Sequence, residues 1–202
     1  WEPTPAATFA QISVTASQRG DLLDNTFSGV SGESITSRGW KHSEGEYAVS
    51  YRGKEWGYAA SARSGGADRY VAVADKALTR PHTISTNSPL ILEYVLSLPA
   101  DTSHESWAYV RLHTSEGKRW THGIYVSTEG EVFLSPAAEP NDPERSPLPS
   151  SAGRVLDMKM ELLPTTVRWY WRNHGTGEPY HRFQHWAVSG PVTITGVRIS
   201  SL

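Results

Sequence analysis

Apolar and polar residues alternate along much of this chain, most regularly between residues 156 and 162. That stretch reads Leu156, Asp157, Met158, Lys159, Met160, Glu161 and Leu162. Successive side chains of a β-strand point to opposite faces, so such a segment buries its apolar face and exposes its polar face. An amphipathic helix would need apolar residues at a period near 3.6, which this stretch lacks.

Segments of the same kind recur through the chain and are separated by clusters of glycine, proline, asparagine and serine. They cover residues 46–51, 69–74, 90–98, 107–113, 123–127, 132–135, 155–163, 167–172, 181–188 and 192–199. This spacing is typical of an all-β protein. The absence of a longer sequence repeat argues against a propeller or a solenoid. We therefore predict an antiparallel two-sheet β-sandwich with jelly-roll topology.

A single domain accounts for the chain, because 202 residues fit one β-sandwich covering residues 1–202. Within it, residues 135–150 contain five prolines, and we expect them to form a long loop rather than a ladder of hydrogen bonds. Two interpretations of this loop stay open. It is either a plain connection or a flap over a cleft.

The charge balance limits the classes of partner. With 19 basic and 21 acidic residues, the formal net charge is -2, so any anion site must be local. No apolar run approaches the roughly 20 residues that span a bilayer. We therefore expect a monomer with no nucleic-acid or membrane partner. The chain starts at Trp1 without an initiator methionine, as a mature secreted protein would, so we expect a secreted or extracellular location.

Metal and thiol chemistry find little support. Cysteine is absent, which excludes disulfides, a cysteine nucleophile and cysteine-ligated zinc. His181 and His185 lie on one predicted strand about 13 Å apart, too far to share a metal. We expect no metal or cofactor, although carboxylates such as Asp21 and Asp24 could hold a structural calcium ion.

The strand predicted at residues 107–113 carries the clearest chemical signal. Its aliphatic residues share one face, and alternation places Tyr109, Arg111 and His113 on the other. These side chains supply a proton donor, an anion clamp and a base that titrates near neutral pH. Trp107 continues that face, and an aromatic ring beside polar groups is typical of a saccharide groove. The alternative is an ordinary solvent-facing strand.

A second cluster lies on a hairpin predicted at residues 167–186, with its turn at residues 173–177. One face of the outgoing strand should enter the core through Val167, Trp169 and Trp171. The other face and the return strand offer candidate substrate-binding residues, namely Tyr170, Arg172, Tyr180 and Arg182. We expect the row formed by Tyr109, Arg111 and His113 to share one groove with at least one of Arg172, Tyr180 or Arg182.

Hydrolysis by a pair of carboxylates is disfavoured. Residues 89–94 are similar to the nucleophile strand of small xylanases, with Glu93 at the nucleophile position. A matching acid/base segment is missing, whereas glycoside hydrolysis usually needs two carboxylates.

The chain resembles the concanavalin-like jelly rolls. Residues 90–99, 108–113 and 123–132 are similar to their central strands, and residues 40–47 and 192–199 to their first and last core strands. Arg111-Leu112-His113 resembles the Gln-Ile-His motif of alginate-lyase-like polysaccharide lyases, with Arg in place of Gln. Tyr109-Val110-Arg111-Leu112 resembles the Tyr-Val-Lys-Leu strand with which calreticulin-type lectins contact glucose.

These two resemblances imply two functions, both with a polysaccharide or oligosaccharide as the ligand. The leading hypothesis is a polysaccharide lyase that cleaves an acidic, uronate-containing glycan by β-elimination. Arg111, helped by Arg182 or Arg63, would neutralise the carboxylate, His113 or Tyr109 would abstract the C5 proton, and a tyrosine would protonate the leaving oxygen. The alternative is a non-catalytic carbohydrate-binding module or lectin that uses Trp107, Tyr109 and Arg111.

Overall fold

The computed structural model describes residues 8–16, 20–26, 39–42, 47–51, 58–62, 72–103, 105–116, 119–135, 146–187 and 192–201. Every regular element in these ranges is a β-strand. The strands are β1 Thr8–Ala16, β2 Gly20–Thr26, β3 Lys41–His42, β4 Tyr47–Tyr51, β5 Tyr58–Ala62, β6 Ala72–Thr83, β7 Leu90–Ser97, β8 Ser106–Thr114, β9 Arg119–Val126, β10 Glu131–Ser135, β11 Ser146–Ser151, β12 Val155–Leu163, β13 Thr166–Asn173, β14 His181–Ala187 and β15 Thr193–Ser201.

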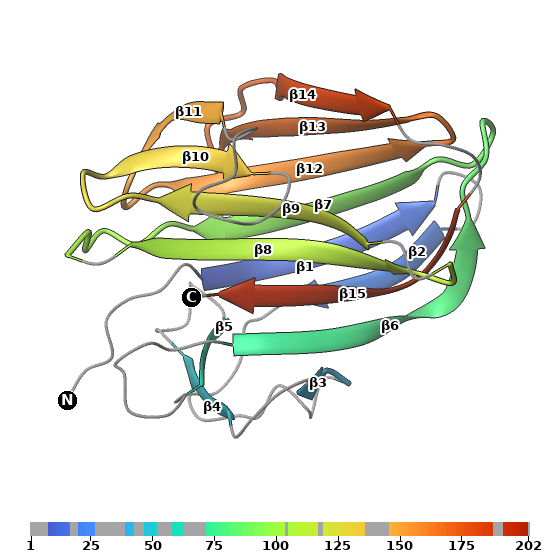
Figure 1. The fold of residues 1–202 in the computed structure, drawn as a ribbon, viewed down its shortest axis with the longest axis horizontal. Helices are drawn as coiled ribbons and strands as arrows, with labels where there is room; N and C mark the ends of the chain where they lie inside the picture. The colour runs from blue at the N-terminus through green and yellow to red at the C-terminus, as the bar shows by residue number, and fades with distance from the viewer. Residues whose placement is uncertain are drawn as a thin grey trace.

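The strands form two antiparallel sheets (Figure 1). The eight-stranded sheet has the order β14-β13-β12-β7-β1-β5-β4, and β2 also pairs with β1. The seven-stranded sheet has the order β11-β10-β9-β8-β15-β6-β3. Consecutive strands therefore lie in different sheets at β2/β3, β3/β4, β5/β6, β6/β7, β7/β8, β11/β12 and β14/β15. This arrangement confirms the predicted two-sheet β-sandwich, whereas the jelly-roll assignment stays a prediction.

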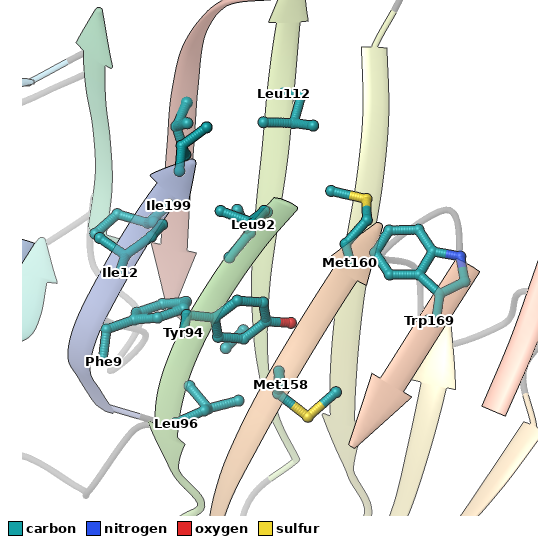
Figure 2. Close-up of a cluster of buried hydrophobic side chains, with 14 of the residues drawn as sticks. Phe9, Ile12, Leu92, Tyr94, Leu96, Leu112, Met158, Met160, Trp169 and Ile199 are labelled. Carbon is teal, nitrogen blue, oxygen red and sulfur yellow. The ribbon is translucent and has the colours of Figure 1, made fainter. Parts of the chain in front are cut away.

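The hydrophobic core fills the space between the sheets (Figure 2). Burial alternates along β7, where every second residue is buried, beginning with Leu90. The buried side chains on the two sheets include Leu92, Leu96, Met158 and Met160 from one, and Leu112 and Ile199 from the other. Burying one such side chain contributes about 1.5–3 kcal/mol. The predicted inward face of residues 156–162 is confirmed, because Leu156, Met158, Met160 and Leu162 are all buried.

A polar pair lies inside this core and links the two sheets. The hydroxyl of Tyr94 on β7 is hydrogen-bonded to Nδ1 of His122 on β9 at 2.8 Å. The imidazole of His122 packs on the ring of Trp169, with centroids 4.0 Å apart. Burial lowers the pKa of His122 to about 3 and raises that of Tyr94, so both groups are neutral at physiological pH.

The proline-rich segment departs from its prediction. Residues 146–151 form β11, which pairs with β10 through Phe133 opposite Pro147 and Leu134 opposite Ser146. β11 is the last strand of its sheet, and an edge strand tolerates proline because one side of its backbone needs no ladder partner. The predicted loop over residues 135–150 is therefore wrong at its C-terminal end. Residues 136–145 lie outside the described residues.

Strand boundaries also differ near the N-terminus. Residues 72–74 of the segment predicted at 69–74 begin β6, which continues to Thr83, and residues 69–71 lie outside the described residues. β1, β2 and β5 were not predicted, and β3 covers only two residues of the segment 40–47 that resembles a first core strand. β1 sits between β7 and β5 in the eight-stranded sheet and is among its better buried strands, with Ile12 and Val14 fully buried.

Candidate functional site

The predicted row of Tyr109, Arg111 and His113 lies on the outer face of β8. β8 itself lies at the middle of the seven-stranded sheet (Figure 1). The intervening residues Val110 and Leu112 are fully buried in the core, while the three polar residues are partly exposed. The predicted division of this strand into two faces is confirmed. β15 flanks β8 on one side and β9 on the other, so residues of both strands neighbour the row.

His113 is held by a carboxylate from a strand two places away. Its Nε2 lies 2.8 Å from Oδ1 of Asp75 on β6. Arg198 on the intervening β15 grips the same carboxylate with two hydrogen bonds, from Nε to Oδ1 at 2.8 Å and from Nη2 to Oδ2 at 2.9 Å. Burial alone would raise the pKa of Asp75, but the bonds from Arg198 and His113 outweigh it and lower that pKa. Asp75 is therefore ionised at neutral pH.

Arg111 is oriented by neutral neighbours. Its Nε donates to Oγ1 of Thr121 on β9 at 3.0 Å, and its guanidinium lies over the ring of Tyr109, 5.0 Å from the centroid. Among the residues that the structure describes, no carboxylate pairs with Arg111. Neither contact neutralises the guanidinium, so its positive charge remains available to an anion.

Glycines border the row on both sides. Gly123 on β9 lies opposite Tyr109, and Gly196 on β15 lies opposite His113. A Cβ atom at Gly196 would lie 3.7 Å from Cδ2 of His113 and 3.0 Å from the backbone oxygen of Lys76. The side-chain layer is therefore thin beside the phenol and the imidazole, which leaves them less crowded than longer neighbours would.

The strands around this row carry a local excess of positive charge. The sequences of β6, β8, β9 and β15 contain one acidic residue, Asp75. They contain five basic residues, namely Lys76, Arg80, Arg111, Arg119 and Arg198. On the outer face, Arg111 supplies positive charge that an acidic ligand would meet, although the chain as a whole carries a net charge of -2.

The hairpin residues lie elsewhere, so the prediction of one shared groove is wrong. Tyr170, Arg172 and Arg182 belong to β13 and β14 in the eight-stranded sheet, and Tyr180 precedes β14. The outer faces of the two sheets of a sandwich point in opposite directions. Alternation shows which residues share a face of one strand, but it does not show to which sheet that strand belongs.

On the eight-stranded sheet these hairpin residues form hydrogen bonds and cation–ring contacts with neighbouring side chains. The Tyr180 hydroxyl donates to Glu93 at 3.3 Å, and the Arg172 guanidinium lies 4.3 Å from the Tyr180 ring centroid. Lys159 lies between the rings of Tyr170 and Tyr180, 5.5 and 5.6 Å from their centroids. Burial raises the pKa of Tyr180, and the charges of Glu93 and Asp157 raise it further. This phenol is consequently a poor proton donor to a ligand.

The other tyrosine of that face is engaged in the same way. The Tyr170 hydroxyl and Nη1 of Arg168 both donate to Oε2 of Glu161 at 3.2 Å. Burial and the negative charge of Glu161 raise the pKa of Tyr170. Arg182 is exposed and lies opposite Tyr170 in the strand register.

An Arg-Asp-His cluster that the sequence did not reveal also lies on the eight-stranded sheet. Nε of Arg172 donates to Oδ2 of Asp157 at 2.8 Å, and Nδ1 of His174 lies 2.5 Å from Oδ1 of the same carboxylate. His174 follows β13 in the hairpin turn, so Asp157 ties that turn to β12. The strand register, with Asp157 opposite Arg172, is the signal that could have identified this pair.

Two predicted site residues cannot be placed in either cluster. The backbone of Trp107 lies on β8 opposite Tyr125, but its side chain lies outside the described residues, as does the whole of Arg63. Within the described ranges, no group of three or more histidine, aspartate or glutamate side chains could hold a metal ion. No helix in those ranges is long and apolar enough to cross a membrane.

Comparisons with known proteins assign no family to the chain. No protein-family profile and no curated protein sequence matches the chain.

Proposed function

We propose that this protein binds an acidic, uronate-containing polysaccharide on the outer face of the seven-stranded sheet and cleaves it by β-elimination. The observation that carries the proposal is the half-exposed row of Tyr109, Arg111 and His113, in which the guanidinium has no carboxylate partner among the described residues. A planar guanidinium binds a carboxylate through two parallel hydrogen bonds. A sugar carboxylate supplies that missing anion.

Elimination assigns one task to each side chain of the row. Arg111 neutralises the uronate carboxylate, which makes the neighbouring C5 proton more acidic. His113 accepts that proton on Nδ1, the ring nitrogen that does not contact Asp75. The C5–H electron pair forms the C4=C5 double bond, and the C4–O4 bond breaks. The Tyr109 hydroxyl donates its proton to the leaving O4, and solvent then exchanges protons with the tyrosine and the histidine.

The eight-stranded sheet supports this choice by contrast. Its strands β7, β12 and β13 carry three acidic residues, Glu93, Asp157 and Glu161, against three basic ones, Lys159, Arg168 and Arg172. The charges of these three strands are balanced, and the hydroxyls of Tyr170 and Tyr180 are bound to glutamates. We further propose that the protein acts outside the cell, where such polymers are encountered, and that it works as a monomer.

The proposal is tested by incubating the full chain with a panel of polyuronates and with neutral glycans. Turnover should create an unsaturated sugar end that absorbs in the ultraviolet, with polyuronates only. Binding of polyuronates without an unsaturated product would show a carbohydrate-binding module instead. Equal binding of neutral and acidic glycans would contradict the acidic-glycan part of the proposal as well.

A further inference from the structure

We infer that Asp75 and Arg198 act together as positioning residues, which place the proton of the neutral His113 ring on Nε2 and its lone pair on Nδ1. The role of this arrangement in turnover rests on the proposed function. The arrangement itself rests only on the contacts of three side chains from three adjacent strands, β6, β15 and β8.

The carboxylate determines which nitrogen carries the proton. An ionised carboxylate accepts hydrogen bonds and cannot donate one. Oδ1 of Asp75 lies 2.8 Å from Nε2 of His113, so Nε2 must supply the hydrogen. In a neutral imidazole the other nitrogen, Nδ1, then carries the lone pair that accepts a proton. Without Asp75, the ring would be free to adopt either tautomer.

Arg198 has a different task, which is to limit the negative charge that His113 experiences. A carboxylate paired with histidine alone would favour the imidazolium and raise the pKa of that histidine. Arg198 binds both oxygens of Asp75, at 2.8 and 2.9 Å, and its positive charge offsets that of the carboxylate. Arg198 therefore fixes the position of Oδ1 of Asp75 against Nε2 of His113 and limits the negative charge beside the ring.

The other charged groups on the strands near His113 are cations. Arg111 lies two residues away on β8, and Arg119 is opposite His113 on β9, although the Arg119 side chain lies outside the described residues. Lys76 follows Asp75 on β6, with its ammonium 5.7 Å from the Trp40 ring centroid. Asp75 is the one acidic residue on β6, β8, β9 and β15, so it is the group there that can orient the ring.

The test is a nitrogen-15 NMR titration of the histidine rings in the full chain without substrate. In the wild type, the His113 ring should be in the Nε2–H tautomer above its pKa. Asp75→Asn removes the carboxylate that accepts from Nε2 and should give a mixture of the two tautomers. Arg198→Met should also admit some of the Nδ1–H form, because Asp75 loses the two bonds that hold it, and Arg198→Lys should admit less of it. Arg168→Met is the matched control, because it removes an arginine–carboxylate pair from the opposite sheet.

A proton on Nδ1 in the wild type would overturn the inference. So would an Nε2–H tautomer that is retained in full in both Asp75→Asn and Arg198→Met. The wild-type and Asp75→Asn results keep the inference testable if Arg198→Met does not fold. Because no substrate is present, a correct titration with no turnover of polyuronates would reject the proposed function alone. A wrong titration with turnover would reject the inference alone.

Discussion

The two outer faces of the sandwich carry the same trio of residues in different surroundings. The seven-stranded sheet has Arg198, Asp75 and His113, and the eight-stranded sheet has Arg172, Asp157 and His174. The Asp157 side chain is 11% exposed and that of Asp75 is 26% exposed. His174 ties down a turn at 48% exposure, while His113 sits on a central strand at 29%.

What surrounds each trio distinguishes a structural role from a chemical one. Beside Asp157, each tyrosine donates to a glutamate, and each cation contacts a ring or a carboxylate. Beside Asp75, Arg111 contacts only a threonine and a tyrosine among the described residues. A satisfied network rigidifies a surface, whereas unpaired polar capacity at a defined position can bind a ligand. Composition alone therefore does not distinguish a site from a structural cluster.

Replacing the two histidines gives the largest expected difference between the faces. His113→Ala removes the proton acceptor and should lower kcat on a polyuronate by about 10²–10⁴-fold. His174→Ala should leave kcat within about twofold, because surface groups away from the site contribute little. Initial rates of unsaturated product measure both. Equal losses in the two variants would contradict the assignment of the site to the seven-stranded sheet.

The second largest difference in turnover is expected between variants of Arg111 and Arg168. Arg111→Lys keeps the charge but loses the two parallel hydrogen bonds to a carboxylate, so turnover should fall by on the order of 10²-fold. Arg168→Lys on the opposite sheet is the matched change and should have no effect on turnover. A small loss of affinity in Arg111→Lys, with no turnover to lose, is what a simple lectin would show.

For the two aspartates, the larger loss of stability is expected on the eight-stranded sheet and the larger loss of turnover on the seven-stranded sheet. Asp157→Asn breaks a partly buried set of charged hydrogen bonds and should lower the free energy of unfolding by about 2 kcal/mol, without changing turnover. Asp75→Asn should cost less stability, since Asp75 is more exposed, but should reduce turnover. Urea denaturation with a parallel rate assay separates the two effects. Loss of turnover in Asp157→Asn at full folding would break the comparison.

The core between the faces supplies an independent pH effect. The pKa of His122 is about 3 in the fold, below its ordinary 6.5, so the unfolded state binds more protons between these values. Stability from this group is present above pH 6.5 and falls as pH decreases, by about 1.4 kcal/mol per pH unit. His122→Gln should flatten the dependence of unfolding free energy on pH between 6.5 and 5.

The strands with regular alternation could be predicted from the sequence, because burial of one face imposes a period of two. β12 was predicted with its observed bounds, and the inward tryptophans of β13 were confirmed. β11 was missed because proline is compatible with an edge position that the sequence does not reveal. The face of Glu93 on β7 could not be assigned among its aliphatic neighbours, yet the structure places it outward against Tyr180.

The candidate site was predictable only within one strand. Alternation grouped Tyr109, Arg111 and His113, but their partners Asp75, Thr121 and Arg198 come from three other strands. Those pairings are set by sheet order and register, which depend on packing across the whole chain. For the same reason the sequence joined Arg172 and Tyr180 to a groove on the wrong side of the sandwich.

The central claim is that Arg111 recognises a uronate carboxylate. The most direct measurement is kcat/KM of the wild type and of Arg111→Met, each on a polyuronate and on the same polymer with its carboxyl groups reduced. The account predicts that Arg111→Met and carboxyl reduction each lower kcat/KM strongly, and that the substitution has little further effect on the reduced polymer, because the two changes remove one interaction. A wild-type protein that treats the native and the reduced polymer alike would contradict the account.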